Sequence, residues 1–200
     1  MNGCVIFDLG GVVIDWNPRH LYRKLFDDEA EMEGFLAEVC TQAWNERQDE
    51  GRPVAVAVAE LTARHPEKRD LIEAYYARWP EMMAGPIEGS PAILEELRDR
   101  GVPLYALSNF SAETFPHARR MFEFLGRFDG MLISGEVGVK KPDPAIFHIL
   151  FERCRIDPRH SVYVDDVPAN VAAGRALDLE ALQFTTAAAL RRDLARLGFL

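Results

Sequence analysis

The 200-residue chain has few cysteines, no long apolar run and fewer cations than anions. Its three cysteines show no zinc-site spacing, and Cys4 and Cys154 lie in apolar or helical patterns that favour buried, reduced thiols. No stretch approaches the roughly 18 apolar residues of a membrane span, and Met1 is not followed by a basic and then an apolar leader segment. We therefore expect a soluble, cytoplasmic protein.

The charge balance excludes some partners. Lys and Arg total 23 against 32 Asp and Glu, which gives a net charge of −9. Such a chain repels nucleic acid and anionic lipid, so we expect neither as a partner. An anionic substrate would need local cations and a divalent metal at its site. The sequence leaves the oligomeric state open.

Strand-like and helix-like patterns alternate from residue 87 onward. Ser90 and Pro91 resemble an N-cap and a first-turn proline, and Gly101 ends the same helix. This alternation predicts a parallel sheet with helices on both faces. The expected strands are 102–107, 131–133, 161–164 and 180–184, and the expected helices are 90–100, 111–126, 143–154, 168–177 and 187–197.

Residues 17–84 break this alternation and predict a small helical domain inserted after the first strand. The core domain would then comprise residues 1–16 and 85–200. Residues 53–58 alternate with period two, so a strand is possible, but their alanines and Leu61 favour a helix. The polar stretch from Trp44 to Arg52 could line a pocket, or it is a solvated helix end with one core tryptophan. The expected helices of this insertion are 19–26, 29–40, 54–65 and 67–79.

Asp8 is the first of several chemically capable residues that follow apolar runs. It ends the run 4–7 and precedes Leu9, Gly10 and Gly11. Glycines let an anion approach closely, and the backbone amides there can donate to developing negative charge. The alternative is an aspartate that only makes a turn or caps a helix.

Ser108, Asn109 and Lys141 occupy comparable positions after later runs. Ser108 and Asn109 supply a hydroxyl and an amide after strand 102–107, although such a pair also occurs at ordinary helix entries. Lys141 precedes Pro142 and is the better candidate to clamp an anion, whereas Lys140 is typical of a solvated surface lysine.

Asp165 and Asp166 follow the run 162–164. Two adjacent carboxylates repel each other unless a cation or hydrogen bonds offset their field, and oxygen-only ligands suit Mg²⁺. Alternatively, the two side chains face opposite ways and one caps the following helix. Groups at the carboxyl ends of parallel strands converge on one crevice, so we expect these residues to share a site with Asp8.

Together, the ordered segments Phe-Asp-Leu-Gly-Gly-Val, Leu-Ser-Asn, Gly-Val-Lys-Lys-Pro-Asp-Pro and Val-Asp-Asp resemble the four motifs of the haloacid dehalogenase-like hydrolase superfamily, over nearly the whole chain. The resemblance implies an α/β fold with a Rossmann-like core and a helical cap domain. It implies that Asp8 is an aspartyl nucleophile, that Asp8, Asp166 and the Gly10 carbonyl bind Mg²⁺, and that Asp165 contributes directly or through water. It also implies that Ser108, Lys141 and the Gly11 region hold the phosphoryl group, with Asn109 supporting that loop.

Gly10 departs from most phosphatases of this superfamily, which carry a general acid–base aspartate at that position. Such help is typically worth 10²–10⁴-fold in rate. The chain resembles a subgroup with Asp-Leu-Gly here, which includes bacterial sugar-phosphate phosphatases. Asp15, His20 or Glu50 are candidate substitutes.

These observations, with the resemblance, predict a Mg²⁺-dependent phosphatase that acts on a small phosphorylated metabolite, such as a sugar phosphate, through an aspartyl-phosphate. One alternative is a 2-haloacid dehalogenase, which needs no metal and does not explain Asp165 and Asp166. Another is a catalytically weak binding or regulatory module, which only Gly10 supports.

Overall fold

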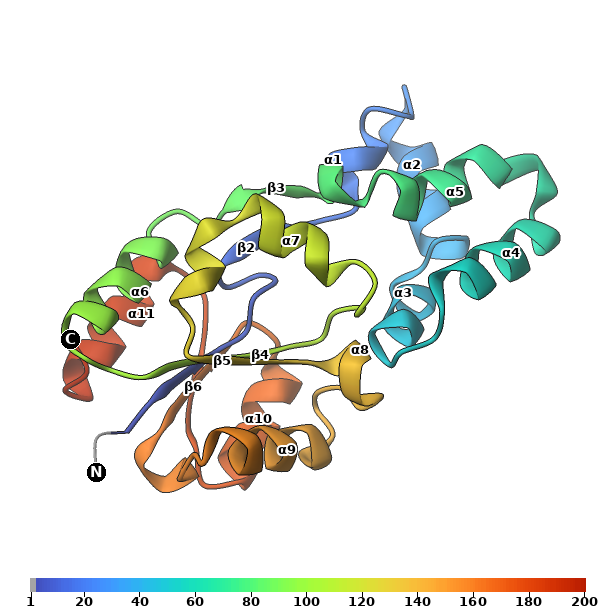
Figure 1. Cartoon of the computed structure of the whole chain (residues 1–200). Coiled ribbons are helices and arrows are strands. Elements are labelled where there is room, and N and C mark those ends of the chain that lie inside the picture. The colour runs from blue at the N-terminus through green and yellow to red at the C-terminus, as the bar shows by residue number, and fades with distance from the viewer. Residues whose placement is uncertain (1–2) are drawn as a thin grey trace.

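A computed structural model describes residues 3–200, and its centre is a five-stranded parallel sheet (Figure 1). The sheet consists of β1 (Val5–Phe7), β4 (Leu104–Ser108), β5 (Gly130–Ile133), β6 (Val162–Asp165) and β7 (Glu180–Gln183), in the order β5-β4-β1-β6-β7. Strand β1 pairs with β4 on one side and β6 on the other, so that Phe7 lies opposite Ala106 and Val164. The predicted α/β class with a Rossmann-like parallel sheet is confirmed.

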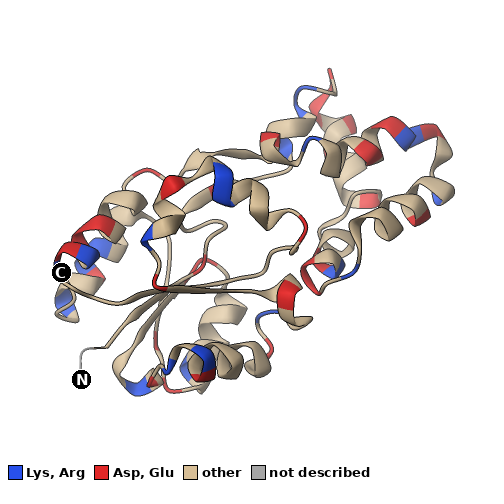
Figure 2. Ribbon diagram, in the orientation of Figure 1, with Lys and Arg blue, Asp and Glu red and all other residues tan. Residues whose placement is uncertain are grey.

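Helices cover both faces of this sheet (Figure 1). One face carries α6 (Ser90–Asp99), α7 (Phe115–Met121) and α11 (Ala187–Arg196), and the other carries α9 (Pro144–Cys154) and α10 (Pro168–Ala176). Because successive strand side chains point to opposite faces, Val5 and Phe7 join one apolar cluster while Ile6 joins the other. Figure 2 shows that charged residues of both signs are interspersed along the helices and sparse on the strands.

Two details of the core differ from the sequence-based expectation. Helix α6 is preceded by Gly89 at φ +83°, and the hydroxyl of Ser90 does not cap the helix but donates to the Val12 carbonyl oxygen at 2.7 Å. The expected helix 111–126 is interrupted at Phe122, whose extended backbone (φ −123°, ψ 98°) separates α7 from a 3₁₀ turn, Glu123–Arg127. Two short elements follow, α8 (Ser134–Val137) and a 3₁₀ turn, Pro158–His160.

Between β1 and α6 the chain is largely helical. An antiparallel pair, β2 (Ile14–Trp16) and β3 (Met83–Pro86), connects these helices to the sheet and was not predicted. The helix predicted from residue 54 onward is confirmed, whereas the expected helices of the insertion did not include residues 42–49, which are helical. The helices are α1 (Arg19–Tyr22), α2 (Glu29–Glu38), α3 (Gln42–Asp49), α4 (Val54–Arg64) and α5 (Arg69–Ala77), with 3₁₀ turns Pro66–Lys68 and Trp79–Met82. The division into two domains stays a prediction.

Aromatic packing holds the inserted helices together. Trp44 on α3 is 6% exposed and meets the ring of Tyr75 edge-on, with centroids 5.1 Å apart. Tyr76 stacks on Trp79 at 5.5 Å. These contacts orient α3 by burying its apolar side, which leaves its polar side for the space above the sheet. Within residues 3–200, no helix combines the length and apolarity needed to cross a membrane.

Candidate active site

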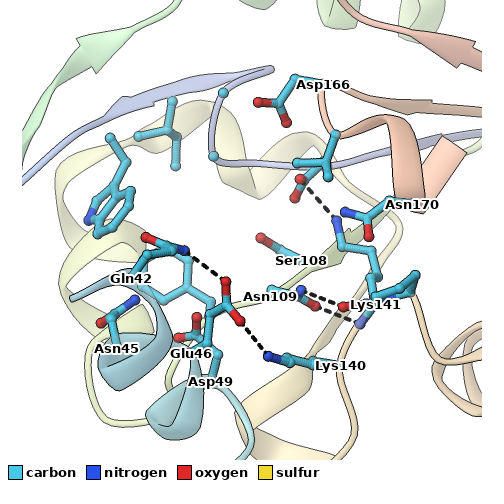
Figure 3. Close-up of a pocket in the computed structure, with 18 of the residues that line it drawn as sticks. Gln42, Asn45, Glu46, Asp49, Ser108, Asn109, Lys140, Lys141, Asp166 and Asn170 are labelled. Atoms are coloured by element: carbon cyan, nitrogen blue, oxygen red, sulfur yellow. Dashed lines mark hydrogen bonds and ion pairs between the residues drawn. The ribbon is translucent and has the colours of Figure 1, made fainter. Parts of the chain in front are cut away.

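A pocket of about 440 Å³ lies between the carboxyl ends of the central strands and the inserted helices (Figure 3). The strand-end loops supply one part of its wall and α3 supplies another. Its lining consists of Asp8, Gly10, Gly11, Ile14, Trp16, Gln42, Asn45, Glu46, Asp49, Trp79, Ser108, Asn109, Phe110, Lys140, Lys141, Pro142, Asp166, Val167, Ala169 and Asn170. The structure therefore brings most of the sequence-predicted site residues to one cavity.

Lys141 joins two carboxylates at the base of the pocket. Its Nζ lies 2.9 Å from Asp8 Oδ2 and 2.7 Å from Asp165 Oδ2, and the lysine side chain is fully buried. The backbone N–H of Leu9 donates to Asp8 Oδ1 at 2.7 Å. The carboxylate at the end of β1 is thus held between a backbone donor and a buried cation.

Burial and neighbouring charges shift the pKa values of Asp8 and Lys141. Burial raises the pKa of Asp8 to about 7, because the pull of Lys141 only partly offsets desolvation and the nearby charges of Asp165 and Asp166. Burial alone would lower the pKa of Lys141, but Asp8 and Asp165 outweigh it and raise that pKa. With all groups ionised, three carboxylates face one ammonium. The site therefore has an unbalanced negative charge that a divalent cation would neutralise.

Asp165 and Asp166 have different surroundings. Both oxygens of Asp165 are occupied: Oδ2 accepts from Lys141 and Tyr163, and Oδ1 accepts from the Val167 N–H at 2.8 Å, while Asn170 Nδ2 lies 3.1 and 3.2 Å from the two oxygens. Burial would raise the pKa of Asp165, but the charge and hydrogen bonds of Lys141, with the other donors, lower it. Asp165 is therefore a fully hydrogen-bonded anion beneath the pocket.

Asp166 is only partly buried and lines the pocket. Desolvation, followed by the charge of Asp165, raises the pKa of its carboxyl. Gly11 makes room for this side chain: its φ is +74°, and a Cβ there would lie 2.4 Å from Asp166 Oδ2. Only glycine satisfies both constraints without displacing the carboxylate.

The donor set fits a divalent metal. One oxygen from each of Asp8, Asp165 and Asp166 lies within 4.8 Å of the other two. Hard oxygen ligands of this kind suit Mg²⁺, which takes one or two carboxylates and keeps several waters. Gly10 also lines the pocket, so its backbone is near the same locus.

Ser108 and Asn109 end β4 beside these groups. Ser108 is 1% exposed and still contributes to the pocket wall. Asn109 accepts from the Lys141 backbone N–H at 2.8 Å and donates to the Lys141 carbonyl at 3.0 Å. This two-bond clamp fixes the lysine-bearing loop to β4.

Helix α3 lines the pocket with residues of the stretch 44–52, which the sequence predicted as either a pocket wall or a helix end, and with Gln42, which lies outside that stretch and was missed. Gln42, Asn45, Glu46 and Asp49 recur at helical spacing on one face of α3 and line the pocket, whereas Trp44 packs inside the insertion. A signal was present: Thr41 is an N-cap whose hydroxyl oxygen accepts from the Trp44 N–H at 3.0 Å.

Lys140 is not the ordinary surface lysine that the sequence suggested. Its Nζ lies 2.7 Å from Glu46 Oε2 and 3.5 Å from Glu50 Oε1, so it links the loop before Lys141 to α3. The three substitutes suggested for the missing acid–base aspartate are placed elsewhere. Asp15 pairs with His20 at 3.0 Å, Glu50 pairs with Lys140, and none of the three lines the described pocket.

Comparison with known proteins agrees with this architecture. The sequence model of the haloacid dehalogenase-like hydrolases matches residues 3–178. The chain is 23% identical to the sesquiterpene phosphatase astK of Aspergillus oryzae, over 96% of this chain and 94% of that protein. It is 25% identical to a phosphorylated carbohydrates phosphatase of Thermotoga maritima, over 88% of this chain and 82% of that protein.

A solved structure supports the fold independently. A haloacid dehalogenase family enzyme of Bacteroides thetaiotaomicron, in complex with magnesium and inorganic phosphate, superposes with a TM-score of 0.68. It is 19% identical, and the match covers 93% of this chain and 96% of that one. The predicted family and the predicted hydrolase class are confirmed: the chain belongs to the haloacid dehalogenase-like hydrolases.

Proposed function

We propose that the protein is a Mg²⁺-dependent phosphatase of small phosphorylated metabolites and that Asp8 is its nucleophile. The observation that carries this proposal is the charge of the site. Asp8 shares its pocket with Asp166 and lies beside buried Asp165, while the ammonium of Lys141 contacts Asp8 and Asp165. A phosphoryl group, which is itself anionic, binds there only if a divalent cation balances the carboxylates. The phosphatases among the relatives support the same reaction.

In the proposed first step, a carboxylate oxygen of Asp8 attacks phosphorus and forms an aspartyl-phosphate while the phosphorus–oxygen ester bond breaks. The departing alkoxide takes a proton from solvent or from a group in the pocket. In the second step, water attacks phosphorus, which releases inorganic phosphate and restores the Asp8 carboxylate. Lys141 and the Ser108 hydroxyl stabilise the phosphoryl oxygens during both steps.

We assign the metal site to Asp8, Asp166 and the Gly10 carbonyl. When bound, Mg²⁺ would offset negative charge on the transferring phosphoryl oxygens. Asp165 has a different role in this proposal, because its oxygens already accept from Lys141, Tyr163, Asn170 and a backbone N–H. It orients Lys141 toward Asp8 rather than binding the ion directly.

Gly10 shapes the expected substrate range. Without an aspartate at this position, esters with poor alkoxide leaving groups lose general-acid help that is typically worth 10²–10⁴-fold. We therefore expect activated esters to be hydrolysed faster than alkyl phosphates. The polar wall from α3 supports a hydroxylated metabolite, such as a sugar phosphate, as the natural substrate class.

The test is turnover of p-nitrophenyl phosphate with and without Mg²⁺, in the wild type, in Asp8→Asn and in Asp27→Asn. Asp27 is an exposed residue of the insertion, so its variant is a matched control for the same chemical change. Metal-dependent turnover that Asp8→Asn abolishes and Asp27→Asn retains supports the proposal. Chloride release from 2-chloropropionate without metal would instead indicate a dehalogenase, and absence of both activities would indicate a binding module.

A further inference from the structure

The polar face of α3 forms a second recognition surface in the pocket, separate from the phosphoryl end. Gln42, Asn45, Glu46 and Asp49 follow the i, i+3, i+4, i+7 spacing of one helix face. Figure 3 shows these side chains across the cavity from Asp166, with Ser108 and Asn109 between. A substrate whose phosphoryl group lies at Asp8 would extend its other end toward this face.

A chain of hydrogen bonds fixes the orientation of the Asn45 side-chain amide. Gln48 Nε2 donates to the Tyr76 hydroxyl at 3.0 Å and to the Trp44 carbonyl at 2.6 Å. The Tyr76 hydroxyl in turn donates its single proton to Asn45 Oδ1 at 3.0 Å. The Asn45 oxygen is therefore occupied, and its Nδ2 has no acceptor among residues 3–200. Asn45 is 3% exposed and lines the pocket, so its Nδ2 can donate a hydrogen bond to a bound substrate.

Asp49 is a buried acceptor without a cation. It is 6% exposed, and among the described residues no Lys, Arg or His forms an ion pair with its carboxylate within 4 Å. Lys140, the nearby cation, is engaged by Glu46 at 2.7 Å and by Glu50 at 3.5 Å. Burial, together with the charges of Glu46 and Glu50, raises the pKa of Asp49 to about 7, although the charge of Lys140 and a hydrogen bond from the Ser111 backbone lower it.

A buried carboxylate without a counter-ion costs free energy, which a bound cation would recover. Three carboxylates on α3 and its C-terminal end face one ammonium, so this end of the pocket favours a positive charge. The aromatic rings of Trp16 and Trp79, whose centroids are 5.4 Å apart, add an apolar wall suited to the carbon face of a ring.

We propose that Asp49 and Asn45 select a substrate that carries an ammonium group next to a hydroxyl, namely a phosphorylated amino sugar. Asp49 receives the ammonium N–H donors, and Asn45 Nδ2 donates to the neighbouring hydroxyl oxygen. This inference rests on the proposed phosphatase function and specifies the substrate class of the same pocket.

The experiment compares kcat/KM for two pairs of esters that differ only in ammonium against hydroxyl. The pairs are glucosamine 6-phosphate with glucose 6-phosphate, and galactosamine 1-phosphate with galactose 1-phosphate. We expect the wild type to prefer the amine at least tenfold in one pair, which corresponds to about 1.4 kcal/mol. In Asp49→Asn the preference should fall below about twofold, whereas Asp27→Asn should retain it. Because each preference is a ratio within one preparation, a general loss of activity cancels.

The two proposals fail in different ways. Turnover of p-nitrophenyl phosphate with equal kcat/KM for amine and hydroxyl esters in both pairs would overturn the amino-sugar inference alone. An amine preference that survives Asp49→Asn would do the same. If no ester is hydrolysed, the phosphatase proposal fails, and calorimetric Kd values then test the subsite directly. Equal Kd values for glucosamine 6-phosphate and glucose 6-phosphate would overturn it.

Discussion

Replacing Lys141 with methionine would leave two buried carboxylates without their cation. Among residues 3–200, Lys141 is the only Lys, Arg or His within 4 Å of Asp8 or Asp165. Methionine retains much of the side-chain volume, so the change is mainly electrostatic. The adjacent lysine offers a matched control, because Lys140→Met removes a cation that is 21% exposed and whose partners are about half exposed.

The expected loss in the free energy of unfolding follows from burial. Removing one partner of a buried ion pair typically costs 3–5 kcal/mol, whereas an exposed pair contributes about 0–1 kcal/mol. For a chain of this length, each kcal/mol shifts the midpoint of thermal unfolding by roughly 2–4 °C. Lys141→Met should therefore lower the midpoint by roughly 6–20 °C, and Lys140→Met by less than about 4 °C.

The stability lost on replacing Lys141 with methionine should depend on pH with a definite sign. Without Lys141, burial raises the folded-state pKa of Asp8 and Asp165 above their unfolded values, so the variant loses stability as pH rises through the folded pKa. The deficit should be larger at pH 8 than at pH 5. Denaturant titrations of both variants at the two pH values, with a chelator present, measure it. Equal losses for the two lysine variants, or a deficit that grows toward pH 5, would refute the reasoning.

Three further perturbations test other parts of the site. Gly11→Ala should raise the Kd for Mg²⁺ and cost about 1–2 kcal/mol of stability, because φ is +74° and the new Cβ meets Asp166; an unchanged Mg²⁺ titration would contradict this. Asp166→Asn should weaken Mg²⁺ binding at least tenfold by calorimetry, and wild-type affinity would remove Asp166 from the metal site. The pKa of Asp49 in the folded protein is about 7, raised from 3.8, so its contribution to the free energy of unfolding is lost as pH rises toward 7. Asp49→Asn should therefore gain about 2–3 kcal/mol relative to wild type between pH 5 and pH 8 in denaturant titrations, and a constant difference would contradict it.

Local patterns were sufficient for the strands of the parallel sheet and for most catalytic candidates, but not for the antiparallel pair β2 and β3. Short apolar runs mark buried strands, and a parallel sheet brings the residues after those strands to one edge. Asp8, Ser108, Lys141 and Asp166 were therefore predictable as neighbours before any coordinates. The helix at Val54 was also predictable, because alanine-rich spacing outweighs a period-two coincidence.

Helix α3 was not predictable in the same way. It has little apolar periodicity, and its place is decided by Trp44 packing on Tyr75, a contact between residues far apart in the chain. The partners of Lys140 on α3 depend on the same packing. Long-range aromatic contacts, rather than local preference, thus position the polar wall of the pocket.

The chain order of its motifs determined which family this protein belongs to and which side chains meet at the strand ends. Tertiary packing decided the surroundings, and therefore the role, of each of those side chains. Asp165 and Asp166 are identical and adjacent, but one is enclosed by Lys141, Tyr163 and Asn170 and the other faces the pocket. That difference arises because successive residues leaving a strand point in different directions, and because folding brings Lys141, which is 24 residues away in the chain, onto Asp165.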